Sequence, residues 1–342
     1  MRLPATAPMN PTDRAAARLR FAREALAEPG LRLSPASADA SFRSYWRTCG
    51  GGPSLIVMDA PPEHENIGPW LEIAGRLRRA GLNAPQVLAV DREHGFVLMS
   101  DLGTRALLSA LDADRVDALY GQVLDALFAI QSRVAASGLP DYDETRLVAE
   151  MELMPAWFLQ RHIGFTPGCE QWDTIESTFR ALLDNALAQP RVFVHRDFHS
   201  RNLMVCDPGP GILDFQDAVR GPITYDLVSV LRDCYIAWPE GRVYDWVEGY
   251  RRRLAEAGLV DVDGARFRQW FDLMGVQRHL KVLGIFSRLN YRDGKPGYLA
   301  DLPRVWRYTR QVGLQYDATR PLVELLERAI GGADPGRCGT NG

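Results

Sequence analysis

Residues 191–218 read RVFVHRDFHSRNLMVCDPGPGILDFQDA, and this stretch decides the fold. Val192–Val194 is apolar and predicts a short buried strand. Leu203–Val205 predicts a second strand, and Asp207–Gly211 supplies the Pro and Gly residues of a turn. Ile212–Leu213 predicts a third strand that runs into a carboxylate. The stretch therefore predicts a strand, a polar loop and a hairpin that ends at an acidic residue.

Three polar residues in this stretch fit the chemistry of phosphoryl transfer. One carboxylate must orient a hydroxyl group and accept its proton, and oxygen ligands must hold Mg²⁺ against the phosphates. Asp197 lies in the loop after the first strand, Asn202 follows five residues later, and Asp214 ends the hairpin. Because the hairpin folds the chain back, we expect Asp214 to lie beside Asn202. Asp197 is the predicted base, and Asn202 and Asp214 are the predicted metal ligands.

The pattern HxDxxxxN followed by Asp-Phe resembles the catalytic core of the protein-kinase-like superfamily, in its aminoglycoside phosphotransferase and choline kinase branch. The resemblance implies ATP as co-substrate and Mg²⁺ as cofactor. It also implies that His195 and Asp226 support the catalytic loop, with Asp226 buried and accepting hydrogen bonds from the loop backbone. A carboxylate at the start of a helix is favoured by capping and by the helix dipole.

Three further stretches resemble a narrower group, the bacterial anomeric kinases of cell-wall sugar recycling. They are Ala40–Arg43 (ASFR), Leu55–Pro62 (LIVMDAPP) and Gln277–Gly284 (QRHLKVLG). This resemblance implies a kinase that phosphorylates the anomeric hydroxyl of N-acetylmuramate or N-acetylglucosamine in peptidoglycan recycling.

The first hundred residues predict a small sheet with an inserted helix. Patterning and turn residues predict an N-terminal helix over 11–30, strands over 31–35, 41–47, 54–59, 86–91 and 95–100, and a helix over 66–80. The predicted fold is α+β, a bilobal protein-kinase-like fold with a five-stranded antiparallel N-lobe sheet and a mainly helical C-lobe. We expect the N-lobe to span 1–101 and the C-lobe 102–342. By resemblance, the hinge that holds adenine is formed by Met99, Ser100, Asp101 and Leu102.

The N-lobe departs from the family pattern at the phosphate site. Residues 1–280 contain no lysine, and Met58 occupies the strand position where such kinases carry one. Residues 37–41 also lack a Gly-rich loop. Arg43 and Arg47 lie four apart on a predicted strand, hence on one face, and arginine can bind phosphate through two parallel hydrogen bonds. We expect Arg43 to contact ATP; the alternative is an arginine that faces solvent at the sheet edge.

The rest of the chain predicts helices. Apolar residues at three- and four-residue steps place them at about 112–130, 144–162, 169–188, 225–236, 242–257, 264–289, 302–312 and 319–330.

Substrate-binding residues are predicted in the catalytic loop and the C-terminal helices. His199 and Arg201 are placed to meet the acceptor sugar or the transferred phosphate, although His199 could equally point into packing. Residues 275–310 hold eight Arg or Lys, including Arg278, against two acids. A basic wall suits an anionic acceptor such as a sugar acid, unless it is a solvated face balanced by acids elsewhere.

Composition excludes several classes of protein. The net charge is −3, which does not favour binding to nucleic acid, and no apolar run is long enough to suggest a membrane span or a signal peptide. The five cysteines show no metal-binding or paired spacing, so we expect reduced thiols in the cytoplasm. The small-molecule partners predicted are an amino sugar and ATP, and we expect a monomer.

Two alternatives remain open from the sequence. One is an aminoglycoside- or choline-type kinase, which the basic C-terminal region disfavours. The other is a catalytically inactive kinase-like binding protein, which the missing lysine favours and the complete set Asp197, Asn202 and Asp214 disfavours.

Overall fold

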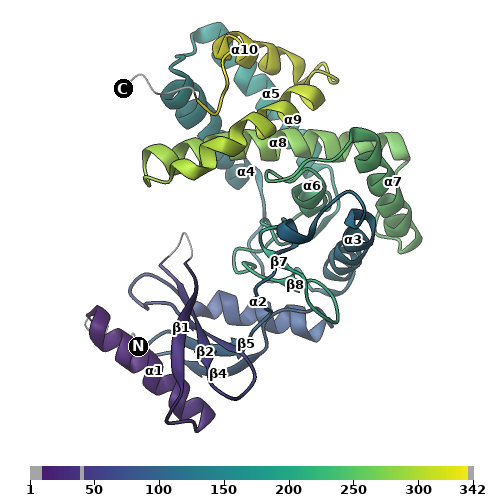
Figure 1. Ribbon diagram of the computed structural model, residues 1–342. Helices are drawn as coiled ribbons and strands as arrows, with labels where there is room; N and C mark the ends of the chain where they lie inside the picture. Colours follow the sequence, from purple (N-terminus) through teal and green to yellow (C-terminus); the bar gives the residue numbers. More distant parts are fainter. Residues whose placement is uncertain (1–9, 39–41, 338–342) are drawn as a thin grey trace. The chain divides into compact units, whose positions relative to one another are not determined.

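The computed structural model describes residues 10–38 and 42–337 (Figure 1). Two compact units can be distinguished, and both are discontinuous along the chain. The first consists of residues 1–110 and 202–217, and the second of residues 111–201 and 218–342. The hairpin that follows the catalytic loop therefore belongs to the first unit, whereas the loop itself belongs to the second.

The first unit is built on a five-stranded antiparallel sheet, which confirms the predicted sheet. Its strands lie in the order β1-β2-β3-β5-β4. They are β1 (Arg32–Ala38), β2 (Ser44–Cys49), β3 (Leu55–Asp59), β4 (Val87–Asp91) and β5 (Phe96–Ser100). β3 and β5, which pair with each other, are buried along most of their length, whereas β2 is only partly buried.

Helix α1 (Pro11–Leu26) lies against this sheet (Figure 1). Asn10 caps its first turn by accepting a hydrogen bond from the backbone of Asp13. The core between them includes Ala22 of the helix and Val57 and Leu98 of the sheet. The helix also buries Arg18, whose guanidinium pairs with Asp59 at 2.7 Å.

Helix α2 (Ile67–Arg79) buries one apolar face and begins at Asn66, whose side chain accepts a hydrogen bond from the Gly68 backbone at 2.9 Å. The chain then passes Gly81, whose φ of 81° lies in the left-handed region that glycine adopts without strain. The hairpin of β7 (Leu203–Met204) and β8 (Gly211–Ile212) joins this unit near the short helix η1 (Leu107–Ala110).

The second unit is mainly helical. Its elements are α3 (Val116–Arg133), α4 (Glu144–Met151), η2 (Met154–Ile163), α5 (Cys169–Leu187), β6 (Arg191–Val194), β9 (Val219–Pro222), α6 (Tyr225–Leu231), α7 (Glu240–Glu256), α8 (Gly264–Tyr291), η3 (Pro296–Asp301), α9 (Leu302–Gly313) and α10 (Arg320–Ile330). Among the residues that the structure describes, no helix is long and apolar enough to cross a membrane.

Helix α8 is the central element of this unit and is buried along most of its middle section. It contacts η2, α5, α6 and α9. The backbone of Leu153 approaches α8 so closely at Gly284 that a Cβ there would lie 2.3 Å from the carbonyl carbon of Leu153. Glycine at position 284 is therefore required for this contact.

Three elements differ from the sequence prediction. The helix predicted over 144–162 divides into α4 and the π-helical segment η2, because Pro155 has no backbone N–H to continue the α-helical pattern. Helix α6 ends at Leu231 rather than at 236. The carboxylate of Asp233 accepts hydrogen bonds from the backbones of Ser200 and Tyr235 at 2.8 and 2.9 Å, and this fixes a turn in place of further helix.

The third difference is β9, which pairs antiparallel with β6 and was not predicted. Its sequence, VRGP, contains glycine and proline, which both weaken strands. A strand of this length also shows too little apolar alternation to be recognised in the sequence.

Candidate active site

The catalytic loop begins where β6 ends, and its backbone is held by Asp226. The Asp226 carboxylate, at the start of α6, accepts hydrogen bonds from the backbone N–H groups of His195 and Arg196 at 2.6 and 3.0 Å. Both Asp226 and His195 are fully buried. Burial raises the pKa of Asp226 to about 6, although the His195 ring and the two backbone donors act in the opposite direction.

Asp197 follows in this loop and is half-buried. Burial disfavours its charged form, but the positive charges of Lys281, His199, Arg278 and Arg196 outweigh burial and lower the pKa of Asp197 below its usual value. A carboxylate that stays ionised can accept a proton, as the predicted base must.

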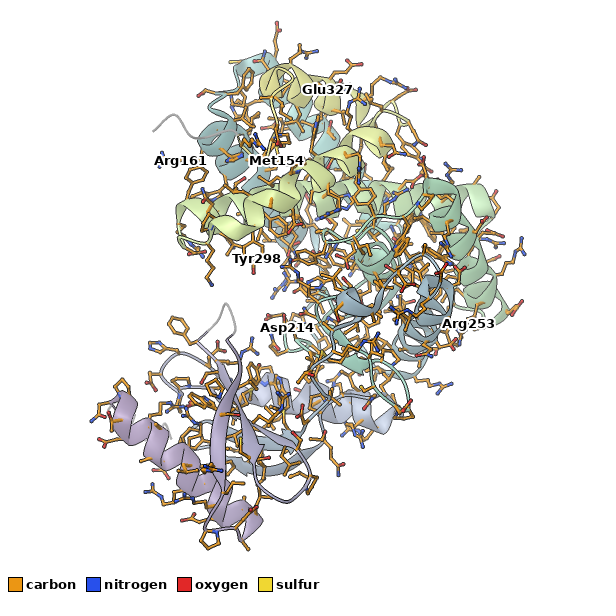
Figure 2. All side chains as sticks on the ribbon, in the orientation of Figure 1. Met154, Arg161, Asp214, Arg253, Tyr298 and Glu327 are labelled. Atoms are coloured by element: carbon orange, nitrogen blue, oxygen red, sulfur yellow. The ribbon has the colours of Figure 1, made fainter. Side chains whose placement is uncertain are left out.

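Asn202 and Asp214 lie side by side in the first unit, at the two ends of the β7–β8 hairpin. The Asn202 side-chain amide donates a hydrogen bond to Asp214 at 3.2 Å, and the Leu213 backbone donates to the Asn202 carbonyl at 3.0 Å. Figure 2 marks Asp214, whose backbone has a φ of 60°. Amide and carboxylate oxygens are the ligands that Mg²⁺ takes in kinases, so this pair fits a metal site.

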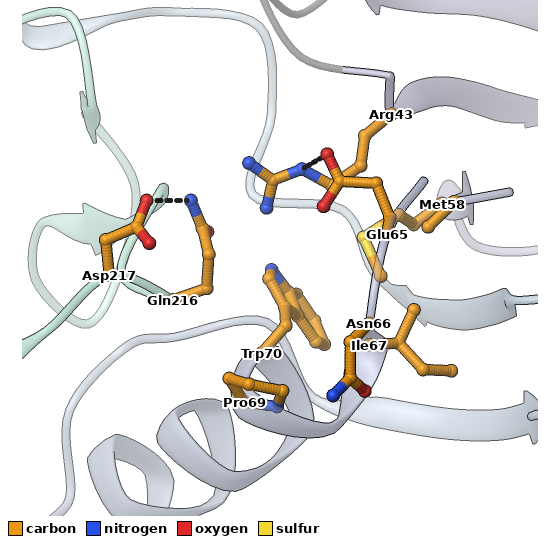
Figure 3. A pocket seen from close by; sticks show the side chains of 10 residues that line it. Arg43, Met58, Glu65, Asn66, Ile67, Pro69, Trp70, Gln216 and Asp217 are labelled. Carbon is orange, nitrogen blue, oxygen red and sulfur yellow. Dashed lines mark hydrogen bonds and ion pairs between the residues drawn. The ribbon is translucent and has the colours of Figure 1, made fainter. Parts of the chain in front are cut away.

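A cavity of about 150 Å³ in the first unit lies next to this pair (Figure 3). Its lining consists of Arg43, Met58, Ala60, Glu65, Asn66, Ile67, Pro69, Trp70, Gln216 and Asp217. Arg43 is the cation of this lining. Its Nη2 lies 3.7 Å from Oδ1 of Asp214, and its Nε lies 4.0 Å from Oε1 of Glu65. The cavity therefore contains a buried guanidinium that also lies close to the carboxylate of the predicted metal site, Asp214.

The placement of Arg43 corrects one detail of the sequence prediction, because Arg43 precedes β2 rather than lying on it. Its side chain is buried, which disfavours the alternative of an arginine that faces solvent at the sheet edge. Arg47 does lie on β2, but its guanidinium binds Asp101 through hydrogen bonds of 2.6 and 3.0 Å. Residues 39–41, part of the predicted phosphate loop, are outside the described residues.

The predicted hinge begins at the end of β5. Met99 and Ser100 are the last residues of that strand, and Asp101 and Leu102 follow it. The Asp101 carboxylate accepts hydrogen bonds from Arg47, from the Ser54 hydroxyl and from the Gly103 backbone. The carboxylate is thus occupied with fixing the chain, which leaves any contact with a nucleotide to the backbone of this segment.

The three predicted substrate residues gather in the second unit around Cys234 and Tyr235, which follow α6. Arg201 lies over the Tyr235 ring at 3.5 Å, and the His199 ring meets the same ring edge-on at 5.3 Å. Arg278 of α8 is buried and donates to the Cys234 sulfur at 3.4 Å, while its Nε has no hydrogen-bond partner. A buried guanidinium with an unsatisfied N–H is suited to an anionic or hydroxyl ligand.

The basic region of residues 275–310 does not form one uniform wall. Lys281 is buried and pairs with Glu150 at 3.1 Å, and Arg310 pairs with Glu327 on α10. Arg304 binds Asp301 at 2.8 Å. Acids therefore partly neutralise the excess of positive charge seen in the sequence; Asp301 lies within this region, whereas Glu150 and Glu327 lie outside it.

Sequence reasoning missed two acidic residues beside the predicted site. Glu150 pairs with Arg196 and Lys281, and Glu65 lies near Arg43. Nothing in the local sequence around Glu150 indicates its role, because its charged partners, Arg196 and Lys281, lie at least 46 residues away. Lys281 offered a signal, since it is the first lysine in the chain.

Comparison with known proteins places this chain in a family. Residues 32–268 match the model of the phosphotransferase enzyme family (APH). A protein from Pseudomonas aeruginosa named N-acetylmuramate/N-acetylglucosamine kinase is 46% identical over 90% of this chain and 91% of its own length. A protein of the same name from Neisseria meningitidis is 42% identical over 89% of this chain and 92% of its own length.

Solved structures of low sequence identity share the fold. An ethanolamine kinase from Plasmodium vivax superposes with a TM-score of 0.61 at 9% identity, over 86% of this chain and 87% of that one. A choline kinase from Streptococcus pneumoniae superposes with a TM-score of 0.59 at 11% identity, over 85% of this chain and 98% of that one. An ADP-bound aminoglycoside phosphotransferase superposes with a TM-score of 0.55 at 14% identity, over 87% of this chain and 98% of that one. The predicted protein-kinase-like fold is thus confirmed, and this chain belongs to the phosphotransferase enzyme family.

Proposed function

We propose that this protein is an ATP-dependent kinase that phosphorylates the anomeric hydroxyl of N-acetylmuramate and N-acetylglucosamine in peptidoglycan recycling. The observation that carries the proposal is the name shared by the curated relatives, together with an intact set of Asp197, Asn202 and Asp214. We place the reaction in the cytoplasm and assign it to a monomer.

In this proposal the first unit binds ATP and the second binds the sugar. Backbone groups of Met99, Ser100, Asp101 and Leu102 hold the adenine ring. The Arg43 guanidinium contacts the phosphates in place of the lysine that Met58 replaces. The proposal is supported by the burial of Arg43 in a cavity that also contains Met58.

Asp197 orients the sugar hydroxyl and accepts its proton as the oxygen attacks the terminal phosphorus of ATP. The bond between that phosphorus and the bridging oxygen of ADP breaks, so the products are a sugar phosphate, ADP and a protonated Asp197. Asn202 and Asp214 hold Mg²⁺, which when bound offsets the negative charge of the phosphates. The lowered pKa of Asp197 keeps it ionised before the reaction.

His199, Arg201 and Arg278 contact the acceptor. N-acetylmuramate carries a carboxylate on an ether-linked substituent that N-acetylglucosamine lacks, and a guanidinium can bind a carboxylate. The Arg201 side chain is 45% exposed and packs over the Tyr235 ring, so Arg201 is better placed than Arg278 to reach a substituent at the edge of the sugar. Arg201→Gln should therefore raise the KM for N-acetylmuramate more than the KM for N-acetylglucosamine.

One experiment tests the proposed function directly. ADP release is measured with purified protein, ATP and Mg²⁺ over the two amino sugars, an aminoglycoside and choline, and phosphorus NMR identifies the phosphorylated position. Turnover with an aminoglycoside or choline alone, or ATP binding without turnover on any acceptor, would contradict the proposal. Asp197→Asn should lower turnover by roughly 10² or more and leave ATP binding intact, whereas the exposed Asp207→Asn serves as the matched control.

A further inference from the structure

The backbone of Arg196, directly before Asp197, is in an unusual conformation. Its φ is 76°, in the left-handed region that only glycine enters at no steric cost. Ala27 and Asp214 are the other non-glycine residues with positive φ in the described part of the chain. Because this conformation is sterically unfavourable for arginine, interactions around Arg196 must hold it. A relaxed backbone at this position would redirect Asp197.

The Arg196 backbone has one anchor and its side chain has another. Asp226 accepts hydrogen bonds from the N–H groups of Arg196 and of the residue before it. The guanidinium forms an ion pair with Oε1 of Glu150, on α4, and lies 5.6 Å from the centre of the Tyr142 ring. The side-chain anchor comes from a different helix and is therefore independent of the backbone anchor.

Glu150 is itself fixed in a charged state. Its carboxylate is 12% exposed and receives Lys281 Nζ at 3.1 Å on Oε1 and the Tyr142 hydroxyl on Oε2. Lys281 Nζ also donates to the Tyr225 hydroxyl at 3.0 Å. Burial disfavours the charged carboxylate, but Lys281 and Arg196 outweigh burial and lower the pKa of Glu150. Two groups, Lys281 Nζ and the Tyr142 hydroxyl, thus hold the Glu150 carboxylate against Arg196.

We propose that Glu150, held in place by Lys281, is a positioning residue that keeps Arg196 in its left-handed conformation and so aims the Asp197 carboxylate. The inference rests on the proposed role of Asp197 as the base. Without the ion pair, the side chain of Arg196 no longer opposes relaxation of its backbone to negative φ. The fraction of molecules with a correctly aimed carboxylate then falls, and turnover falls with that fraction.

A double-mutant cycle with Arg196→Gly tests this proposal. Glycine takes positive φ without an anchored side chain, so Arg196→Gly defines a second background in which Glu150 should be dispensable for positioning. Glu150→Gln should lower kcat about tenfold in the native background, and less than about threefold in the glycine background. The KM for ATP should stay unchanged in both. Glu152→Gln, an exposed residue at the end of the same helix, is the matched control.

Equal losses of kcat in the two backgrounds would overturn the proposal, because Glu150 would then act only by neutralising buried Lys281. No loss in either background would overturn it as well. Thermal unfolding of each variant identifies those that fail to fold. If Glu150→Gln fails to fold, Glu150→Asp takes its place, because it keeps the charge beside Lys281 but shortens the reach to Arg196. Absence of turnover in the wild type would instead refute the proposed function, and the φ of Arg196 in a crystal structure of Glu150→Gln would still test the positioning.

Discussion

Replacing Arg43 with alanine is the most direct perturbation of the proposed phosphate site. The Arg43 side chain is 8% exposed and lies between two carboxylates, with Nη2 3.7 Å from Asp214 and Nε 4.0 Å from Glu65. Figure 3 shows Arg43 next to Glu65 in the cavity lined by Met58. The substitution removes the cation of this lining and leaves both acids in place.

The expected effect follows from two losses. A charge-assisted hydrogen bond from a guanidinium to phosphate contributes about 1.5–3 kcal/mol, which corresponds to roughly a ten- to hundredfold change. Glu65 then repels the phosphates without the guanidinium beside it to offset its charge, so the effect should lie toward the upper end of that range. Arg43→Lys should recover only part of the loss, because a single ammonium group cannot reproduce two parallel hydrogen bonds.

The assay is the steady-state KM for ATP and kcat at saturating sugar, with ATP affinity measured separately by calorimetry. Arg92→Ala, at an exposed position in the β4–β5 turn, is the control for a lost arginine. Arg47→Ala should mainly lower thermal stability, because Arg47 binds Asp101. If Arg43→Ala had the KM and kcat of the wild type, the phosphates would be held by backbone amides and metal alone and the reasoning would fail.

Three further predictions concern the metal, a packing contact and pH. Asp214→Asn should lower turnover by at least about 10² and raise the Mg²⁺ concentration needed for half-maximal rate, measured by Mg²⁺ titration; an unchanged titration would remove Asp214 from the metal site. Gly284→Ala should lower the free energy of unfolding by about 3 kcal/mol in urea, because its Cβ would meet backbone atoms of Leu153, whereas Gly249→Ala, with open space around it on α7, should raise it by about 0.5–1 kcal/mol. Burial lowers the pKa of His279 to about 3, so the neutral ring is favoured in the folded state, and its contribution to stability is complete above about pH 6.5 and is lost as pH falls toward 3. The free energy of unfolding of the wild type minus that of His279→Gln should fall by up to about 1.4 kcal/mol per pH unit as pH decreases in that window. A difference that does not change with pH would refute the lowered pKa of His279.

Most of the fold follows from local sequence signals. The catalytic stretch predicted β6, the β7–β8 hairpin and the proximity of Asn202 to Asp214, because short-range turn residues and alternating apolar runs determine these features. The strands of the first unit were predicted for the same reason.

What could not be predicted depends on contacts between distant segments. The burial of Arg18 on α1 requires Asp59, 41 residues away, and a charged residue on an otherwise apolar face carries no local sign of its partner. The break at Pro155 was visible in the sequence but was outweighed by the apolar period on both sides of it. The role of Glu150 could not be predicted either, because it depends on ion pairs with Arg196 and Lys281 that only the folded structure brings together.

The lysine content has a practical consequence for chemical labelling of this protein. Nucleotide analogues that acylate amines identify ATP sites by reacting with a nearby lysine, yet residues 1–110 and 202–217 contain no lysine at all. Lys281, in the second unit, is 6% exposed and has its Nζ occupied by Glu150 and Tyr225. An amine-directed probe would therefore find no lysine to acylate in the unit to which we assign nucleotide binding. A reagent directed at guanidinium groups, with ATP as the protecting ligand, is the suitable alternative for mapping the cavity that contains Arg43.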